Sequence, residues 1–128
     1  MAVAAMLAHA GCSIGGDEEP KPVTGAAKEI AATVDQLERA VAQRDYATIC
    51  NELFTATARE RAGGGECVSQ MRSAAEDVLR PAIQIEQIAV KDDRAVVTVA
   101  TTAKGQARVT DTLELRRAGR AWLIEALS

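Results

Sequence analysis

Apolar residues between positions 24 and 45 repeat with the period of an α-helix. They are spaced at i, i+4, i+7 and i+11, which places them on a single face. Thr24 precedes this stretch and is a residue type that caps helix N-termini. The pattern therefore predicts a long first helix with one buried face. The residues of that face are Ile30, Val34, Leu37 and Val41.

Three shorter helices are expected next. Asp45 is a suitable N-cap for a helix over residues 45–54, and a further helix starts at Thr55 and stops at the three glycines 63–65. A last helix begins after these glycines and ends before Pro81. The helix over residues 45–54 has an apolar face of Tyr46, Ile49, Cys50 and Leu53, and the last helix has Cys67, Met71, Ala74 and Val78 in phase.

Beyond Pro81 the period changes from 3.6 to 2, which is typical of β-strands. The first strand changes phase between Ile85 and Ile88, which predicts a bulge. Three further strands are expected, separated by turns at "KDDR", "AKGQ" and "RAGR". The third strand places Val109, Asp111, Leu113 and Leu115 on one face, and the last places Trp122 and Ile124 together. Helices followed by an antiparallel four-stranded meander indicate an α+β fold.

Composition narrows the class of protein further. The chain has 128 residues, which is room for one domain, and 48% of them are hydrophobic. The net charge of -3, with Lys and Arg scattered among acids, argues against a nucleic-acid-binding protein. No apolar run reaches the length of a transmembrane helix.

The N-terminal residues are typical of an export signal. Residues 1–16 contain no Asp, Glu, Lys or Arg, and small residues precede Cys12. This segment resembles the lipobox of bacterial lipoproteins, in which the cysteine is acylated, although His9 stands where that pattern has leucine. We expect residues 1–12 to be a signal peptide with its lipobox and 13–23 a flexible tether. The alternative is a short buried helix ending near Gly16.

Residues 24–128 then form one α+β domain, and their layout resembles another group of proteins. The layout resembles that of small bacterial lipoproteins of the nuclear transport factor 2-like (ketosteroid-isomerase-like) superfamily. The matching parts are a long first helix, the "RDYATIC" step, the "GGGEC" turn and the final meander ending in "AWLIEAL". The resemblance implies a curved sheet wrapped around helices to form a cone, with a pocket at its wide end.

Cysteine usage agrees with export. Three cysteines leave one unpaired in an oxidising compartment, and acylation of Cys12 removes that difficulty. Cys50 and Cys67 are then expected to form a disulfide, worth about 3 kcal/mol in the chain-entropy model. Two buried reduced thiols are the alternative. Metal binding is not expected, because the domain has no CxxC pair and loses its only histidine with His9.

No residue is assigned a catalytic role, and no cofactor is expected, because the chain lacks GxSxG, HExxH and phosphate-binding glycine motifs. Asp111 shares the apolar face of its strand and is a candidate pocket anchor or general base. The alternative is a structural role in which Asp111 forms an ion pair with an arginine such as Arg94 or Arg108. The other pocket candidates, each with a packing role as the alternative, are Tyr46, Phe54 and Trp122.

These observations predict an exported, non-catalytic domain, anchored by Cys12 to the outer face of the bacterial cytoplasmic membrane. Its cone binds a small apolar molecule or presents a surface to another envelope protein, and a homodimer is left open. One alternative is a small isomerase or cyclase that uses Asp111 and Tyr46. Another is an interaction module whose cone is filled with side chains.

Overall fold

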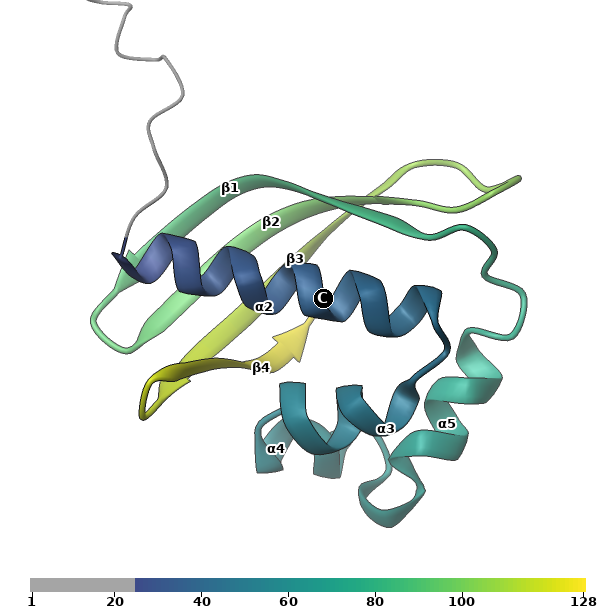
Figure 1. The fold of residues 1–128 in the computed structure, drawn as a ribbon, viewed down its shortest axis with the longest axis horizontal. Coiled ribbons are helices and arrows are strands. Elements are labelled where there is room, and N and C mark those ends of the chain that lie inside the picture. The colour runs from purple at the N-terminus through teal and green to yellow at the C-terminus, as the bar shows by residue number, and fades with distance from the viewer. Residues whose placement is uncertain (1–24) are drawn as a thin grey trace, which may run out of the picture.

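The computed structural model of the chain describes residues 25–128. The signal peptide, Cys12, the tether and the Thr24 cap predicted from the sequence lie outside these residues. The described chain has its helices first and a four-stranded antiparallel sheet after them (Figure 1). The predicted α+β class is therefore confirmed.

Helix α2 (Gly25–Ala42) is the long helix expected from the apolar repeat, and it crosses one face of the curved sheet (Figure 1). Ile30 and Val34 are fully buried, because they pack into the main core cluster between helix and sheet. Leu37 and Val41, on the same face, are only half-buried. The face of α2 is therefore fully covered at Ile30 and Val34 but only partly covered toward its C-terminal end.

A chain of short helices follows α2. They are α3 (Tyr46–Thr48), the π-helix η1 (Ile49–Leu53), α4 (Ala56–Arg61), the 3-10 turn η2 (Gly64–Glu66) and α5 (Cys67–Ala74). Asp45 caps α3 as predicted, since its carboxylate accepts hydrogen bonds from the Thr48 amide at 3.2 Å and the Thr48 hydroxyl at 2.7 Å. Thr55 caps α4 by accepting from the amide of Ala58 at 3.1 Å. The predicted buried face over residues 46–53 is also present.

The end of α5 corrects a sequence prediction. The helix stops at Ala74 rather than continuing to Pro81, and Ala74 is exposed whereas Ala75 is half-buried. Beyond it the backbone makes tight turns, and the amide of Lys104 donates a 2.7 Å hydrogen bond to the carbonyl of Leu79. This bond ties the α5–β1 linker to the β2–β3 loop. In this segment, a contact with a distant part of the chain is present where the sequence predicted further helical turns.

The sheet has the order β1-β2-β3-β4, formed by Ala82–Lys91, Arg94–Thr102, Val109–Ala118 and Ala121–Leu127. The predicted bulge in β1 is present as a register shift between Ile85 and Gln87. A second irregularity, between Glu114 and Leu115, was not predicted. Because bulges bend a strand and increase its twist, these two positions support the curvature of the sheet around α2.

The core lies between α2 and the concave face of the sheet. Trp122 is its largest fully buried side chain, and it packs with Ile30, Val34 and Leu115 in one cluster. The hydroxyl of Thr33 on α2 donates a 2.8 Å hydrogen bond to the carbonyl of Trp122. This bond satisfies a buried polar side chain and fixes the helix against β4.

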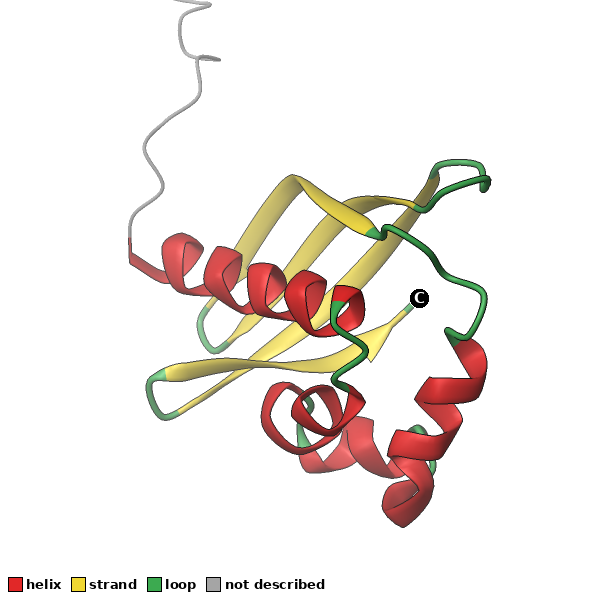
Figure 2. Ribbon diagram, turned by 45° about the vertical axis from the view of Figure 1, so that its right-hand side comes forward, coloured by secondary structure: helices red, strands yellow, loops and turns green. Residues whose placement is uncertain are grey.

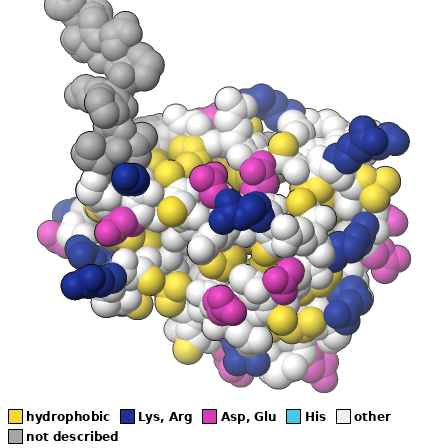
Figure 3. All heavy atoms as spheres, viewed as in Figure 1, with side chains coloured by type: hydrophobic (Ala, Val, Ile, Leu, Met, Phe, Trp, Pro, Cys, Tyr) yellow, Lys and Arg dark blue, Asp and Glu magenta, His cyan; other side chains and the backbone are white. Residues whose placement is uncertain are grey.

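Charged side chains of both signs are interspersed over the face of the molecule seen in Figure 3, as the sequence pattern predicts for a solvated surface. Within residues 25–128, no helix has the length and apolar character needed to cross a membrane.

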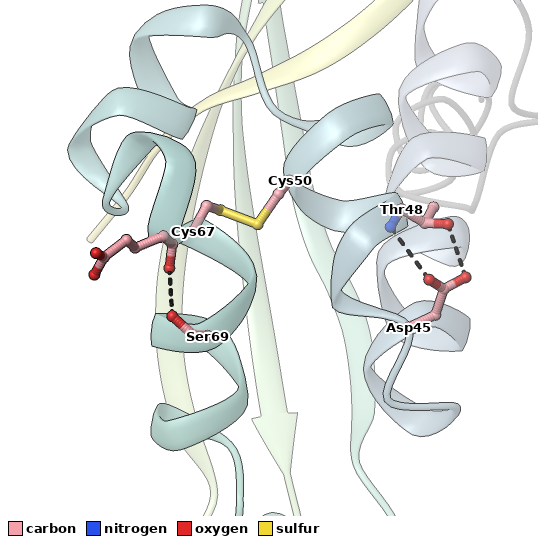
Figure 4. The surroundings of a disulfide bond; sticks show 6 residues. Asp45, Thr48, Cys50, Cys67 and Ser69 are labelled. Carbon is pink, nitrogen blue, oxygen red and sulfur yellow. Dashed lines mark hydrogen bonds between the residues drawn. A yellow bond between two sulfur atoms is a disulfide. The ribbon is translucent and has the colours of Figure 1, made fainter.

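The structure contains the predicted disulfide between Cys50 and Cys67 (Figure 4). Both cysteines are buried, with Cys50 in η1 and Cys67 at the start of α5. The bridge closes a separation of 17 residues that includes α4 and the glycine-rich turn. It therefore joins η1 directly to the start of α5, two helical segments that are separated along the chain by α4 and the glycine-rich turn.

Removing this bridge tests its contribution to stability. A Cys50→Ala/Cys67→Ala double variant is expected to lose about 3 kcal/mol of unfolding free energy, because the unfolded chain regains the entropy of an open loop. Urea unfolding followed by circular dichroism measures the loss. Wild-type protein treated with a reductant is the matched comparison, and a double variant as stable as the oxidised wild type would contradict a stabilising role for the bridge.

Candidate functional site

A cavity of about 290 Å³ lies between the C-terminal half of α2 and the concave face of the sheet. Leu37 and Val41 form its wall on α2, and Val99 and Leu113 form its wall on the sheet. The α5–β1 linker and the β2–β3 loop, seen beyond the C-terminal end of α2 in Figure 2, contribute the rim. The cavity thus occupies the part of the cone that α2 does not fill.

Side-chain size accounts for the position of this cavity. Trp122 fills the space between the sheet and the N-terminal half of α2, where Ile30 and Val34 are buried. Opposite Leu37 and Val41 the sheet offers smaller side chains, such as Val99 and Thr101. A core that is closely packed at one end therefore leaves an open volume at the other.

Most of the lining is apolar. Val99, Leu113 and Ile124 are buried in the sheet with about 2% exposure or less. Phe54 and Met71 close the cavity on the side of the short helices. Such walls favour an apolar occupant, since burying apolar surface is the main source of favourable free energy for a ligand there.

The polar lining comes from one segment of the chain, β2, the β2–β3 loop and the start of β3. Thr101, Thr102, Gln106 and Asp111 supply it. The hydroxyl of Thr101 lies 3.4 Å from a carboxylate oxygen of Asp111 and 3.4 Å from the carbonyl oxygen of Val109, and these two acceptors share its one proton. Among the lining residues, all of which belong to the described chain, only Asp111 has an ionisable side chain. The cavity thus has one polar side and several apolar sides.

Neither arginine considered as a partner pairs with Asp111. Arg108 forms a 2.7 Å ion pair with Glu86 instead. Arg94 lies opposite Arg116 in the sheet register, whereas Asp111 lies opposite Val99 near the other end of β2. The sheet register therefore separates Asp111 from Arg94, and Glu86 engages Arg108.

Phe54 lines the cavity because the backbone leaves the helical conformation at this residue. Its φ and ψ of -92° and 147° are extended, and it forms a single parallel bridge with Ile124 of β4. The amide of Thr55 strengthens this junction by donating a 2.9 Å hydrogen bond to the carbonyl of Ile124. Phe54 is therefore held between the short helices and the sheet.

The other two pocket candidates are placed differently. Tyr46 and Trp122 are buried members of the core cluster, with exposures of 3% and 2%, and neither is a lining residue of the cavity. Asp111 and Tyr46, the pair on which the isomerase or cyclase alternative depends, are therefore not brought together in this cavity.

The cavity has a neighbouring hollow. Phe54, Met71, Ile124 and Leu127 are shared between it and a second depression of about 280 Å³ next to α4. These four residues border both volumes. Met71 is unbranched and adaptable, which suits a wall that has space on both sides.

Glu38 is a positioning residue that the sequence reasoning missed. Its carboxylate accepts a 2.7 Å hydrogen bond from the amide of Ile83 in β1. This bond connects α2 with the edge strand beside the cavity, where Leu37 and Ile83 are both lining residues. The only signal in the sequence is a carboxylate adjacent to the apolar stripe, which is also typical of solvated helix positions.

Comparison with solved structures identifies the fold. The chain is similar to a nuclear transport factor 2 (NTF2)-like protein of unknown function from Silicibacter pomeroyi, with 18% identity, a TM-score of 0.60, and coverage of 78% of this chain and 90% of that one. An NTF2-like protein of unknown function from Shewanella baltica gives 14% identity, a TM-score of 0.53, and coverage of 82% and 98%. A de novo designed NTF2 fold protein gives 15% identity, a TM-score of 0.57, and coverage of 80% of this chain and 85% of that one.

The chain therefore has the NTF2-like cone fold, as the sequence resemblance implied. No protein-family model and no curated protein matches the sequence. Because this fold is used for many unrelated purposes, the function has to be argued from the cavity itself.

Replacing Glu38 tests its positioning role. Glu38→Ala is expected to reduce the unfolding free energy by about 1–3 kcal/mol, because the half-buried amide of Ile83 loses its acceptor. Glu38→Gln keeps a side-chain oxygen and is expected to lose less. Urea unfolding of both variants measures the difference. Equal stabilities of the alanine variant and the wild type would show that water replaces the carboxylate at no cost.

Proposed function

We propose that this chain is an exported, membrane-anchored, non-catalytic domain whose cavity binds a small apolar or amphipathic molecule. The cavity of about 290 Å³ with mostly apolar walls carries this proposal. Ligand sites in proteins start at about 300 Å³ and are lined mainly by apolar side chains with a few polar groups. The match favours a small ligand over a cone that is filled by its own side chains.

Two features support export. The disulfide between Cys50 and Cys67 is of a kind that persists in oxidising compartments. It also leaves Cys12, which follows small residues in the lipobox-like segment, as the one cysteine without a partner in the pairing. An acyl chain on Cys12 would account for that thiol and would anchor the domain to the outer face of the bacterial cytoplasmic membrane.

The position of the cavity suits an anchored domain. Helix α2 has 18 residues and is therefore about 27 Å long. Gly25 begins the helix, whereas Leu37 and Val41, which are closer to its C-terminal end, line the cavity. An anchor that precedes Gly25 would hold the domain by the end remote from the cavity. The attachment point would therefore not block the cavity, which would remain accessible to a ligand.

Ligand binding is tested with the neutral apolar dye N-phenyl-1-naphthylamine, whose fluorescence rises when it leaves water. The wild type is expected to bind it, and Ala103→Trp is expected to bind at least about tenfold more weakly, because the indole occupies the cavity beside a half-buried lining residue.

Ala118→Trp is the matched control, since Ala118 is exposed at the end of β3 and is not a lining residue. Thermal unfolding of both variants checks that they fold. Dye binding that is equal in the wild type and both variants would place the dye elsewhere and contradict the proposal.

Membrane anchoring is tested by expressing the full chain in a bacterium with lipoprotein processing. Intact mass is expected to show acylated Cys12 as the first residue, and the protein is expected in the membrane fraction. Cys12→Ser removes the acylated thiol and is expected to abolish both results. An unmodified wild-type chain that retains Met1 would contradict the anchor and leave the ligand proposal standing.

A further inference from the structure

We infer that the ligand carries a protonated amine next to its apolar body, and that the Asp111 carboxylate binds this amine. The inference rests on the proposed binding function and specifies the chemistry of the ligand. It follows from the charge of the cavity, from its graded exposure and from the positions of the nearby basic residues.

Asp111 is a cavity-lining carboxylate without a basic partner. The ion pairs formed within residues 25–128 are Arg108 with Glu86 at 2.7 Å and Arg116 with Glu125 at 3.9 Å. The one hydrogen bond to the Asp111 side chain in this part of the chain is the contact of 3.4 Å from Thr101. The carboxylate therefore has capacity for further donors, because an ionised carboxylate offers about four acceptor positions.

Exposure changes steadily along the inward face of β3. Val109 is 50% exposed, Asp111 is half-buried, and Leu113 and Leu115 are each 2% exposed. Asp111 thus lies between the solvent and the apolar interior. A ligand with its head at Asp111 would place its apolar body against Leu113 and the neighbouring apolar walls.

An apolar ligand without a positive charge would remove water from Asp111 and offer nothing in return. Leaving a charged group desolvated and unpaired costs more than leaving a neutral group in that state. An ammonium group offers three donors and forms strong charge-assisted hydrogen bonds with a carboxylate. Thr101 and Thr102 provide further acceptor oxygens on the same side of the cavity.

The basic residues of the β2–β3 loop do not favour an anionic head. Arg108 is engaged by Glu86, and neither Arg108 nor Lys104 is a lining residue of the cavity. An anionic head would instead lie beside the carboxylate of Asp111 and be repelled by it. The charge of the site is therefore complementary to a cation.

Three amphiphiles with the same alkyl chain separate these possibilities. Octylamine, octanol and octanoate are cationic, neutral and anionic at neutral pH. Displacement of N-phenyl-1-naphthylamine from the full chain, at one fixed ionic strength, gives their relative affinities. Octylamine is expected to bind at least about tenfold more tightly than octanol, the factor of one charge-assisted hydrogen bond, and octanoate is expected to bind most weakly.

Asp111→Asn removes the charge with little change in shape. It is expected to abolish the preference for octylamine, while octanol binds at least as tightly as to the wild type, because the apolar walls are intact and a neutral amide costs less to desolvate than a carboxylate. Asp35→Asn is the matched control, since Asp35 is an exposed acid on α2 outside the cavity. It is expected to retain the wild-type preference, which excludes an effect of net charge.

The outcomes distinguish the inference from the proposed function. Equal binding of all three amphiphiles, or tightest binding of octanoate, would overturn the amine head and leave apolar binding in place. A preference for octylamine that persists in Asp111→Asn would also overturn it. Absence of binding by the dye and by every amphiphile would overturn the proposed function itself.

Discussion

The concave face of the sheet must be covered along its whole length, and this requirement shapes the rest of the molecule. Helix α2 is the only long helix among the described residues, and it seals the sheet only where Ile30 and Val34 meet Trp122. Toward Leu37 and Val41 the helix no longer fills the cone, and the short helices must close it. The cavity is the volume that remains open between the C-terminal part of α2, the short helices and the sheet.

Three attachments hold the walls of this cavity in place. The Cys50–Cys67 bridge connects η1 with α5, and the hydrogen bond from Thr55 to Ile124 connects the short helices with β4. Glu38 connects α2 with β1. Each joins elements that come from separate parts of the chain. Within this frame Asp111 is the one ionisable side chain of a mostly apolar lining, and the other polar lining residues, Thr101, Thr102 and Gln106, lie on the same side of the cavity.

Much of the fold follows from local patterns in the sequence. The period of 3.6 located α2, the cap at Asp45 located the start of α3, and the change of phase after Ile85 located a bulge. These features depend on neighbouring residues, so one sequence is enough to find them. The end of α5 at Ala74 was missed, because the hydrogen bond between Lys104 and Leu79 joins segments that are distant in sequence.

The sequence by itself determined which side chains of the regular elements face inward, including Asp111 of the cavity and Tyr46 and Trp122 of the core, whereas it placed Phe54 in a helix that ends at Leu53 in the structure. Only the tertiary structure decided which of them meet open space and which are packed on every side. The period of apolar residues along a helix or strand shows the face on which a residue lies. Whether that face meets a close neighbour depends on the sizes of side chains on other elements, and that information is not local.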